Sequence, residues 1–137
     1  MRLNHVTLAV SDVEASAAFY SRLGLRQIVA SYPDYARFVA PDGDTTLSLQ
    51  RVQQAPPPRS ASIHFEVDDV DAAVAALEDA GVAFLQQPVD GPYLWREAVL
   101  TDPDGNRVFI YRAGEARLDP PWRLPDDDPR ASPRRPA

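Results

Sequence analysis

Apolar and polar residues alternate in short runs through most of the chain, and two stretches carry a helical spacing instead. Residues 3–10 alternate and are rich in apolar and β-branched side chains, so they predict a strand. Apolar residues then recur every three or four positions and predict a helix, at Val13, Ala17, Tyr20 and Leu23. Ser11 and Glu14 fit a capping box with Ser11 as the N-cap, and Gly24 fits the residue that ends the helix.

Three further strands complete the first half of the chain. The runs 25–31 and 35–40 predict two strands around a turn at Pro33-Asp34. Asp42-Gly43 is a hairpin signal that leads into a strand over residues 45–52. The predicted order is therefore strand, helix and three strands.

The same order returns after a spacing of 57 residues. Leu8-Ala9-Val10-Ser11-Asp12-Val13 aligns with Phe65-Glu66-Val67-Asp68-Asp69-Val70. A strand, a helix and three strands are predicted again, at 61–67, 69–80, 82–86, 94–101 and 107–112. Pro88, Gly91 and Pro92 predict a loop before the last two of these strands. A duplicated unit indicates two half-structures that pack together, and binding sites tend to lie where such halves meet.

The pattern predicts an α+β protein built from two βαβββ modules. The first module spans 1–52, a Pro-rich linker spans 53–60 and the second module spans 61–113. The remaining segment, 114–137, holds six of the fourteen prolines, and we expect part of it to be disordered. Trp122 lies in its more apolar first part, and we expect this side chain to dock on the domain or on a partner chain.

Composition removes several classes of function. The chain lacks Cys and Lys, which excludes disulfides, thiolate nucleophiles, Cys-based metal sites and lysine Schiff bases. A net charge of −6 argues against nucleic-acid binding. No apolar run has the length of a membrane span, and the first residues lack a signal-peptide core, so we expect a soluble cytoplasmic protein.

Four motifs together resemble the vicinal oxygen chelate superfamily, which includes glyoxalase I, extradiol dioxygenases, fosfomycin-resistance enzymes and bleomycin-resistance proteins. They are Leu3-Asn4-His5-Val6-Thr7-Leu8-Ala9-Val10-Ser11-Asp12, Phe19-Tyr20-Ser21-Arg22-Leu23-Gly24-Leu25, His64-Phe65-Glu66-Val67-Asp68-Asp69-Val70 and Asp102-Pro103-Asp104-Gly105-Asn106. The resemblance covers residues 3–112. It implies that the two modules form a cup-shaped, mostly antiparallel eight-stranded sheet, the glyoxalase/bleomycin resistance fold. It also implies a homodimer, because such cups are commonly completed by a second chain.

The resemblance further implies four metal-ligand positions in the cup, and here they fall on His5, Ser48, Ser62 and Phe109. Only His5 is a competent ligand, and protein metal sites normally need about three. We therefore expect no metal cofactor. The alternative is one divalent metal on a displaced set of two His and one carboxylate, because alternation places His64 and Glu66 on the same strand face as Ser62.

The same alternation assigns the other residues that face into the cup. With those already named, the expected ligand-binding set is His5, Tyr35, Arg37, Ser48, Ser62, His64, Glu66, Trp95, Glu97, Phe109 and Tyr111. Aromatic walls with a few polar groups suit a flat, conjugated ligand. Three structural alternatives stay open: His5 is a satisfied core imidazole, Arg37 and Glu97 pair across the sheet, and Arg96 lies at a rim or an interface.

Three functions fit these observations. The first is a metal-free protein that binds and sequesters an aromatic natural product or antibiotic, as the bleomycin-resistance branch does. The second is a metal-dependent glyoxalase-like lyase or dioxygenase that uses His5, His64 and Glu66. The third is a non-catalytic small-molecule sensor. We favour the first and assign no catalytic residue.

Overall fold

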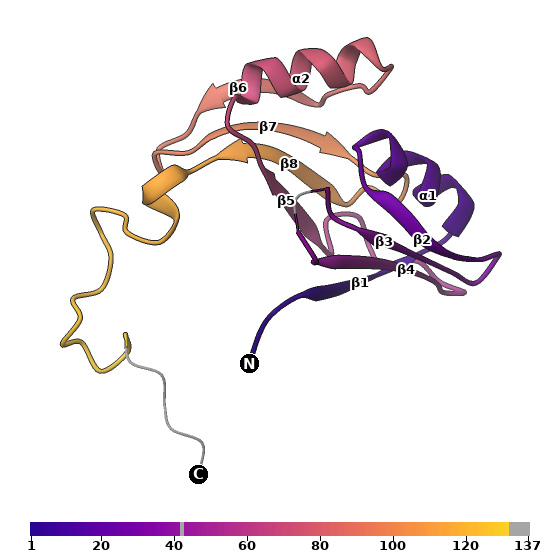
Figure 1. Ribbon diagram of the computed structural model, residues 1–137, viewed down its shortest axis with the longest axis horizontal. Coiled ribbons are helices and arrows are strands. Elements are labelled where there is room, and N and C mark those ends of the chain that lie inside the picture. The colour runs from indigo at the N-terminus through magenta and orange to yellow at the C-terminus, as the bar shows by residue number, and fades with distance from the viewer. Residues whose placement is uncertain (42, 132–137) are drawn as a thin grey trace.

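The computed structural model describes residues 1–41 and 43–131, and both halves of the chain fold as βαβββ (Figure 1). The first module contains β1 (His5–Val10), α1 (Val13–Arg22), β2 (Arg26–Ser31), β3 (Tyr35–Val39) and β4 (Thr46–Arg51). The second contains β5 (Ser62–Glu66), α2 (Val70–Asp79), β6 (Gln86–Asp90), β7 (Arg96–Thr101) and β8 (Arg107–Arg112). A short 3₁₀ helix, η1 (Gly114–Arg117), follows. The α+β class and the duplicated βαβββ order are confirmed.

The strands form two four-stranded sheets, in the orders β1-β4-β3-β2 and β5-β8-β7-β6. β1 pairs with β4 and β5 with β8 in parallel, and the other pairs are antiparallel. Over residues 1–41 and 43–131, no strand pair joins the two sheets into the expected eight-stranded one. β1 and β5 are consequently edge strands that each pair on one side only.

Each sheet buries one face under its own helix. Phe38 and Leu49 are fully buried in the first module, as are Ala98 and Leu100 in the second. Their neighbours in the sequence point to the opposite, helix-free face, because side chains alternate along a strand. In Figure 1, α1 and α2 both lie on the outer side of an arch made by the two sheets, so the helix-free faces line its inner side.

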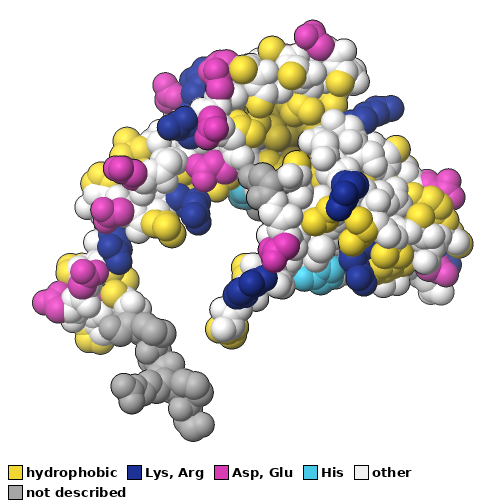
Figure 2. All heavy atoms as spheres, viewed as in Figure 1, with side chains coloured by type: hydrophobic (Ala, Val, Ile, Leu, Met, Phe, Trp, Pro, Cys, Tyr) yellow, Lys and Arg dark blue, Asp and Glu magenta, His cyan; other side chains and the backbone are white. Residues whose placement is uncertain are grey.

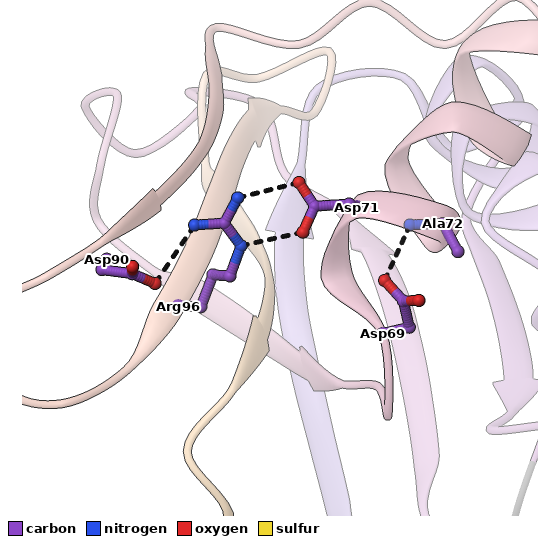
Figure 3. A network of polar contacts seen from close by, with 5 residues as sticks. All are labelled: Asp69, Asp71, Ala72, Asp90 and Arg96. Carbon is purple, nitrogen blue, oxygen red and sulfur yellow. Dashed lines mark hydrogen bonds and ion pairs between the residues drawn. The ribbon is translucent and has the colours of Figure 1, made fainter.

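The helix starts differ by one residue from the predicted capping box. Asp12, not Ser11, is the N-cap of α1, and its carboxylate accepts from the N–H of Ala15 at 3.0 Å. Asp69 caps α2 in the same way through Ala72 (Figure 3). A carboxylate satisfies a free N–H and also suits the positive end of the helix dipole, so it is the stronger cap here.

Ser11 has a different role, because it joins the two modules. Its N–H and hydroxyl both donate to the carboxylate of Asp104, in the turn between β7 and β8. Beside it, the hydroxyl of Tyr20 on α1 donates to Asp102 at 2.8 Å, and both groups are buried. Asn106 donates to the same carboxylate from its backbone and its side chain. The Asp102–Asn106 turn therefore holds α1 of the first module against the second sheet.

The predicted strand over 82–86 is wrong, because β6 runs over Gln86–Asp90 and contains Pro88. β6 is an edge strand, and its pairing with β7 shifts register between Gln86 and Val89. Proline is tolerated at such a place because its missing N–H faces no partner strand. The other strand ends differ by one or two residues.

The predicted Asp42-Gly43 turn and the C-terminal tail lie partly outside the residues that the structure describes. Of the Asp42-Gly43 turn, Asp42 lies outside the described residues, as does the end of the tail, 132–137. Residues 118–131 form turns without a helix or strand. Among the residues described, no helix has the length and apolar character that a membrane crossing requires.

Candidate functional site

Four aromatic rings form a cluster on the helix-free face of the second sheet. The rings of His64 and Phe109 stack with their centroids 4.3 Å apart and their planes 3° apart. Trp95 and Tyr111 complete the cluster at 4.9 Å from each other, and both meet the His64 ring edge-on. The register explains the arrangement: His64 lies opposite Phe109 and Glu66 opposite Tyr111, and paired residues share a face. This cluster of His64, Trp95, Phe109 and Tyr111 is called the aromatic face below.

Burial among these rings shifts the pKa values of two side chains in the aromatic face, His64 and Tyr111. Burial lowers the pKa of His64, and the nearby Glu97 carboxylate opposes this shift in part. Burial also raises the pKa of the Tyr111 hydroxyl, with a contribution from Glu66. Both side chains are thus neutral at pH 7, which suits contact with an uncharged ring system.

Two small cavities flank the aromatic face. One, of about 440 Å³, includes Phe109 and is lined by Arg59, Leu85, Gln86, Glu97, Val99, Arg107 and Phe109. The other, of about 290 Å³, includes Trp95 and is lined by Tyr93, Trp95, Ala116, Arg117, Pro120 and Trp122. Trp122 thus lies beside the domain as expected, although more than half of its surface stays exposed. The sequence did not indicate the contributions of Arg59 and Arg107, because both follow from the tertiary packing.

Glu66 anchors the start of the tail. Its carboxylate accepts from the backbone N–H groups of Ala113 and Gly114 at 2.7 and 3.0 Å, and Arg117 lies 3.7 Å away. Burial raises the pKa of Glu66, but the two backbone hydrogen bonds and the positive charges of Arg117 and Arg112 outweigh it and lower the pKa overall. Glu66 is therefore an ionised, structurally committed group.

A row of hydrogen-bonded polar side chains occupies the helix-free face of the first sheet. Nε of Arg37 donates to the Tyr35 hydroxyl at 2.8 Å, and that hydroxyl is 2.5 Å from Oγ of Ser48. Ser48 is fully buried and lies 3.3 Å from Nε2 of His5, whose Nδ1 is 2.5 Å from Oγ1 of Thr46. These five residues, Arg37, Tyr35, Ser48, His5 and Thr46, are called the polar row below. The register of β1, β3 and β4 thus brings together four expected site residues: His5, Tyr35, Arg37 and Ser48. Thr46, which pairs with His5, was not expected.

The residues at the implied ligand positions do not fit a divalent metal. Ser48 is engaged in the polar row, and Phe109 has no donor atom. Within residues 1–41 and 43–131, no three His, Asp or Glu side chains converge in a way that would hold a metal ion. The displaced set of His5, His64 and Glu66 therefore does not assemble within one chain, and Glu66 is already bonded to the tail.

The pairing considered for Arg37 and Glu97 is not formed among the described residues, because the two side chains belong to different sheets. Arg96 instead makes a two-pronged contact with Asp71 of α2, at 2.9 and 2.8 Å, and a third with Asp90 of β6 at 3.1 Å (Figure 3). It joins the helix to the sheet edge and lies outside the site.

A cavity of about 740 Å³ lies between the two modules, and both faces of β5 contribute to its lining. It runs along the open edges of β1 and β5 and under α2, with apolar lining that includes Val6, Leu25, Ile63, Phe65 and Leu77. Three expected site residues, Ser62, His64 and Glu66, also line it, as does Thr46 of the polar row. Figure 2 shows hydrophobic surface exposed in the hollow beside α2. The apolar part of this cleft has no signal in the sequence, because alternation assigns Ile63 and Phe65 simply to the core.

Comparison with known proteins gives a family and several relatives. The profile of the Glyoxalase/Bleomycin resistance protein/Dioxygenase superfamily matches residues 2–110. An uncharacterized protein of Mycolicibacterium smegmatis is 33% identical over 107 residues, which is 77% of this chain and 89% of that protein. The anthracycline biosynthesis protein DnrV of Streptomyces peucetius is 32% identical over 125 residues. That match covers 78% of this chain but only 45% of DnrV.

Solved structures share the fold. A glyoxalase/bleomycin resistance protein/dioxygenase from Nocardioides superposes with a TM-score of 0.74 at 23% identity, covering 91% of this chain and 90% of its own. Lactoylglutathione lyase from Agrobacterium tumefaciens gives 0.66 at 20% identity, with coverages of 81% and 92%. At these identities the likeness shows the fold alone.

Proposed function

This chain belongs to the Glyoxalase/Bleomycin resistance protein/Dioxygenase superfamily, and on that premise we propose that it binds and sequesters a planar aromatic small molecule without a metal. The observation that carries the proposal is the aromatic face. Its four rings are held in contact on the sheet surface opposite α2, where Tyr111 is nearly buried and the other three rings are at least partly exposed. Rings arranged in this way favour flat ligands by offset stacking, each contact being worth about 0.5–1.5 kcal/mol beyond burial.

Two further observations support this function over metal-dependent catalysis. The donor set does not fit a divalent metal, since Ser48 and Phe109 occupy implied ligand positions and Glu66 is committed to the tail. In addition, one relative takes part in anthracycline biosynthesis, and anthracyclines are polycyclic aromatic compounds. A lyase or dioxygenase activity has no comparable support in the geometry.

Tryptophan fluorescence tests the proposal. In a Trp122→Phe variant, Trp95 is the one remaining tryptophan, so its emission reports on the aromatic face. We expect saturable quenching by daunorubicin and by 2-methoxy-1,4-naphthoquinone, and recovery of both compounds unchanged. Phe109→Ala in this background should weaken binding about tenfold, because a stacking wall is lost. Tyr32→Ala, an exposed aromatic on the first module, is the matched control and should leave binding unchanged. Absence of saturable quenching and of calorimetric heat with both compounds would overturn the proposal.

We further propose that the protein works as a homodimer. β1 and β5 present open edges to the apolar cleft between the modules, and an open edge is a template for pairing with another chain. Val6 on β1 is 37% exposed beside this cleft, where a second copy would cover it. Such a copy would place its own sheet next to the open edge and extend the cup.

A further inference from the structure

We propose that the polar row of the first sheet is an oxyanion site, which selects planar ligands that carry an ionised ring oxygen, such as an enolate or a phenolate. The proposal rests on the proposed function and names the class of ligand it takes. The aromatic face would bind the ring system, and the polar row would bind the charged oxygen attached to it.

The polar row has a single consistent direction of hydrogen bonds. Thr46 donates its proton to the carbonyl of Asn4 at 3.4 Å, so Oγ1 of Thr46 accepts from Nδ1–H of His5. Nε2 of His5 then carries no hydrogen and is the acceptor for two hydroxyl groups, those of Ser48 and Thr7, each 3.3 Å away. These assignments follow from satisfying every donor and acceptor along the row.

The other end of the row continues in the same direction. The hydroxyl of Ser48 donates its proton to His5, so the Ser48 oxygen accepts a hydrogen bond from the Tyr35 hydroxyl. The Tyr35 oxygen in turn accepts a hydrogen bond from Nε of Arg37. Every bond thus points away from the guanidinium. Buried Ser48 fixes the middle of the row, so the Tyr35 oxygen and Arg37 are held in place at its open end.

The open end presents positive charge and N–H donors. Arg37 uses Nε for Tyr35 and lies with its guanidinium 5.4 Å from the centre of the Tyr35 ring. Among the described residues no carboxylate pairs with it, whereas Arg51 of the same sheet is bonded to Asp34. A guanidinium that is oriented but not neutralised by protein charge is suited to bind an anionic oxygen through its terminal nitrogens.

The pKa of Tyr35 supports a positive electrostatic potential at the open end of the polar row. Burial raises the pKa of Tyr35, but the hydrogen bond donated by Arg37 and its positive charge act against burial, and the pKa lies below the usual value. Surroundings that stabilise a negative oxygen at Tyr35 also stabilise a ligand oxygen placed next to it.

Position in the fold supports a shared ligand. The polar row and the aromatic face are both on helix-free faces, and these faces line the inner side of the arch in Figure 1. Figure 2 shows the histidine colour in two separate patches, one for each half of the molecule. The two halves offer different chemistry, because the first carries Arg37 with hydrogen-bonded hydroxyl groups and the second carries the four aromatic rings.

The test compares two compounds with the same ring system. 2-Hydroxy-1,4-naphthoquinone is ionised at pH 7.5, whereas 2-methoxy-1,4-naphthoquinone is neutral, and calorimetry measures the affinity of the full chain for each. We expect the hydroxy compound to bind about tenfold more tightly, since a charge-assisted hydrogen bond distinguishes it. Arg37→Gln and Tyr35→Phe should remove this preference, because they weaken the hydroxy compound more than the methoxy compound. Arg26→Gln, an exposed arginine on β2 of the same sheet, is the matched control and should keep the preference.

The outcomes separate the two proposals. If both compounds bind the wild type equally, or if Arg37→Gln and Tyr35→Phe fold normally by circular dichroism and keep the preference, the oxyanion site is wrong and the aromatic binding function stands. If neither compound binds, the function itself is overturned, and the oxyanion site with it. Two separate variants guard against one of them failing to fold.

Discussion

At the scale of single residues, the site depends on which side chains are already engaged. Ser48 is one of the four ligand positions that the resemblance implies, and Glu66 belongs to the displaced set considered as an alternative. Glu66 holds the start of the tail through Ala113 and Gly114, and Ser48 is the buried middle of the polar row. Because their oxygen atoms already take part in these hydrogen bonds, the two side chains are less available to coordinate a metal ion.

His64 should make the stability of the fold depend on pH. Burial lowers its pKa in the folded state, so between the unfolded value of about 6.5 and the folded value only the unfolded chain binds the proton. Stability should therefore fall as the pH drops from about 6.5 through the folded pKa. Urea unfolding at a series of pH values measures this effect, and His64→Phe should remove it. The same decline with pH in His64→Phe would show that another group is responsible.

At the scale of elements, both α-helices are capped by an aspartate and each sheet has two edge strands. The β6 edge accommodates Pro88 by shifting register, while Arg96 ties the neighbouring β7 to α2 through Asp71 (Figure 3). These contacts keep the helices on the outer side of the arch and leave the inner faces open.

Asp12→Ala should lower the free energy of unfolding by about 1 kcal/mol, because the N–H of Ala15 loses its acceptor at the start of α1. Glu14→Ala, the partner in the capping box that the sequence suggested, should change it by much less. Urea unfolding followed by circular dichroism compares the two variants. Equal losses in both would contradict Asp12 as the cap.

At the scale of the whole molecule, two half-sites are placed on separate sheets. The Tyr20–Asp102 hydrogen bond and the Ser11–Asp104 contacts connect the modules at the end of α1. The open edges of β1 and β5 run along the cleft between the modules. A second copy at this cleft would change how the aromatic face and the polar row meet.

Val6→Arg should weaken the proposed homodimer, because it places a charge in the apolar cleft beside the open β1 edge. Val89→Arg is the matched control: Val89 is 45% exposed on β6 and does not line the cleft. Sedimentation velocity over a range of concentrations measures the dimer in each variant. A monomeric wild type, or a dimer that survives Val6→Arg as well as it survives Val89→Arg, would refute this interface.

The sequence by itself determined the modules and most of the inward-facing residues. Two helical stretches, the 57-residue repeat and strict alternation suffice for this, because the period of a strand assigns each side chain to a face. Alternation therefore placed His64, Phe109 and Tyr111 together, and likewise Tyr35 and Arg37. The capping residue and β6 were misplaced because local patterns do not record which carboxylate reaches an N–H or where a sheet has its edge.

Only the tertiary structure decided how these faces are used. Pairing is a contact between distant segments, so the separation into two sheets, the cleft along β1 and β5 and the Tyr20–Asp102 contact have no local signature. The same holds for the commitment of Glu66 to the tail and for the direction of the polar row. Both depend on distances between atoms that are far apart in the chain, and these distances decide which polar groups are left to meet a ligand.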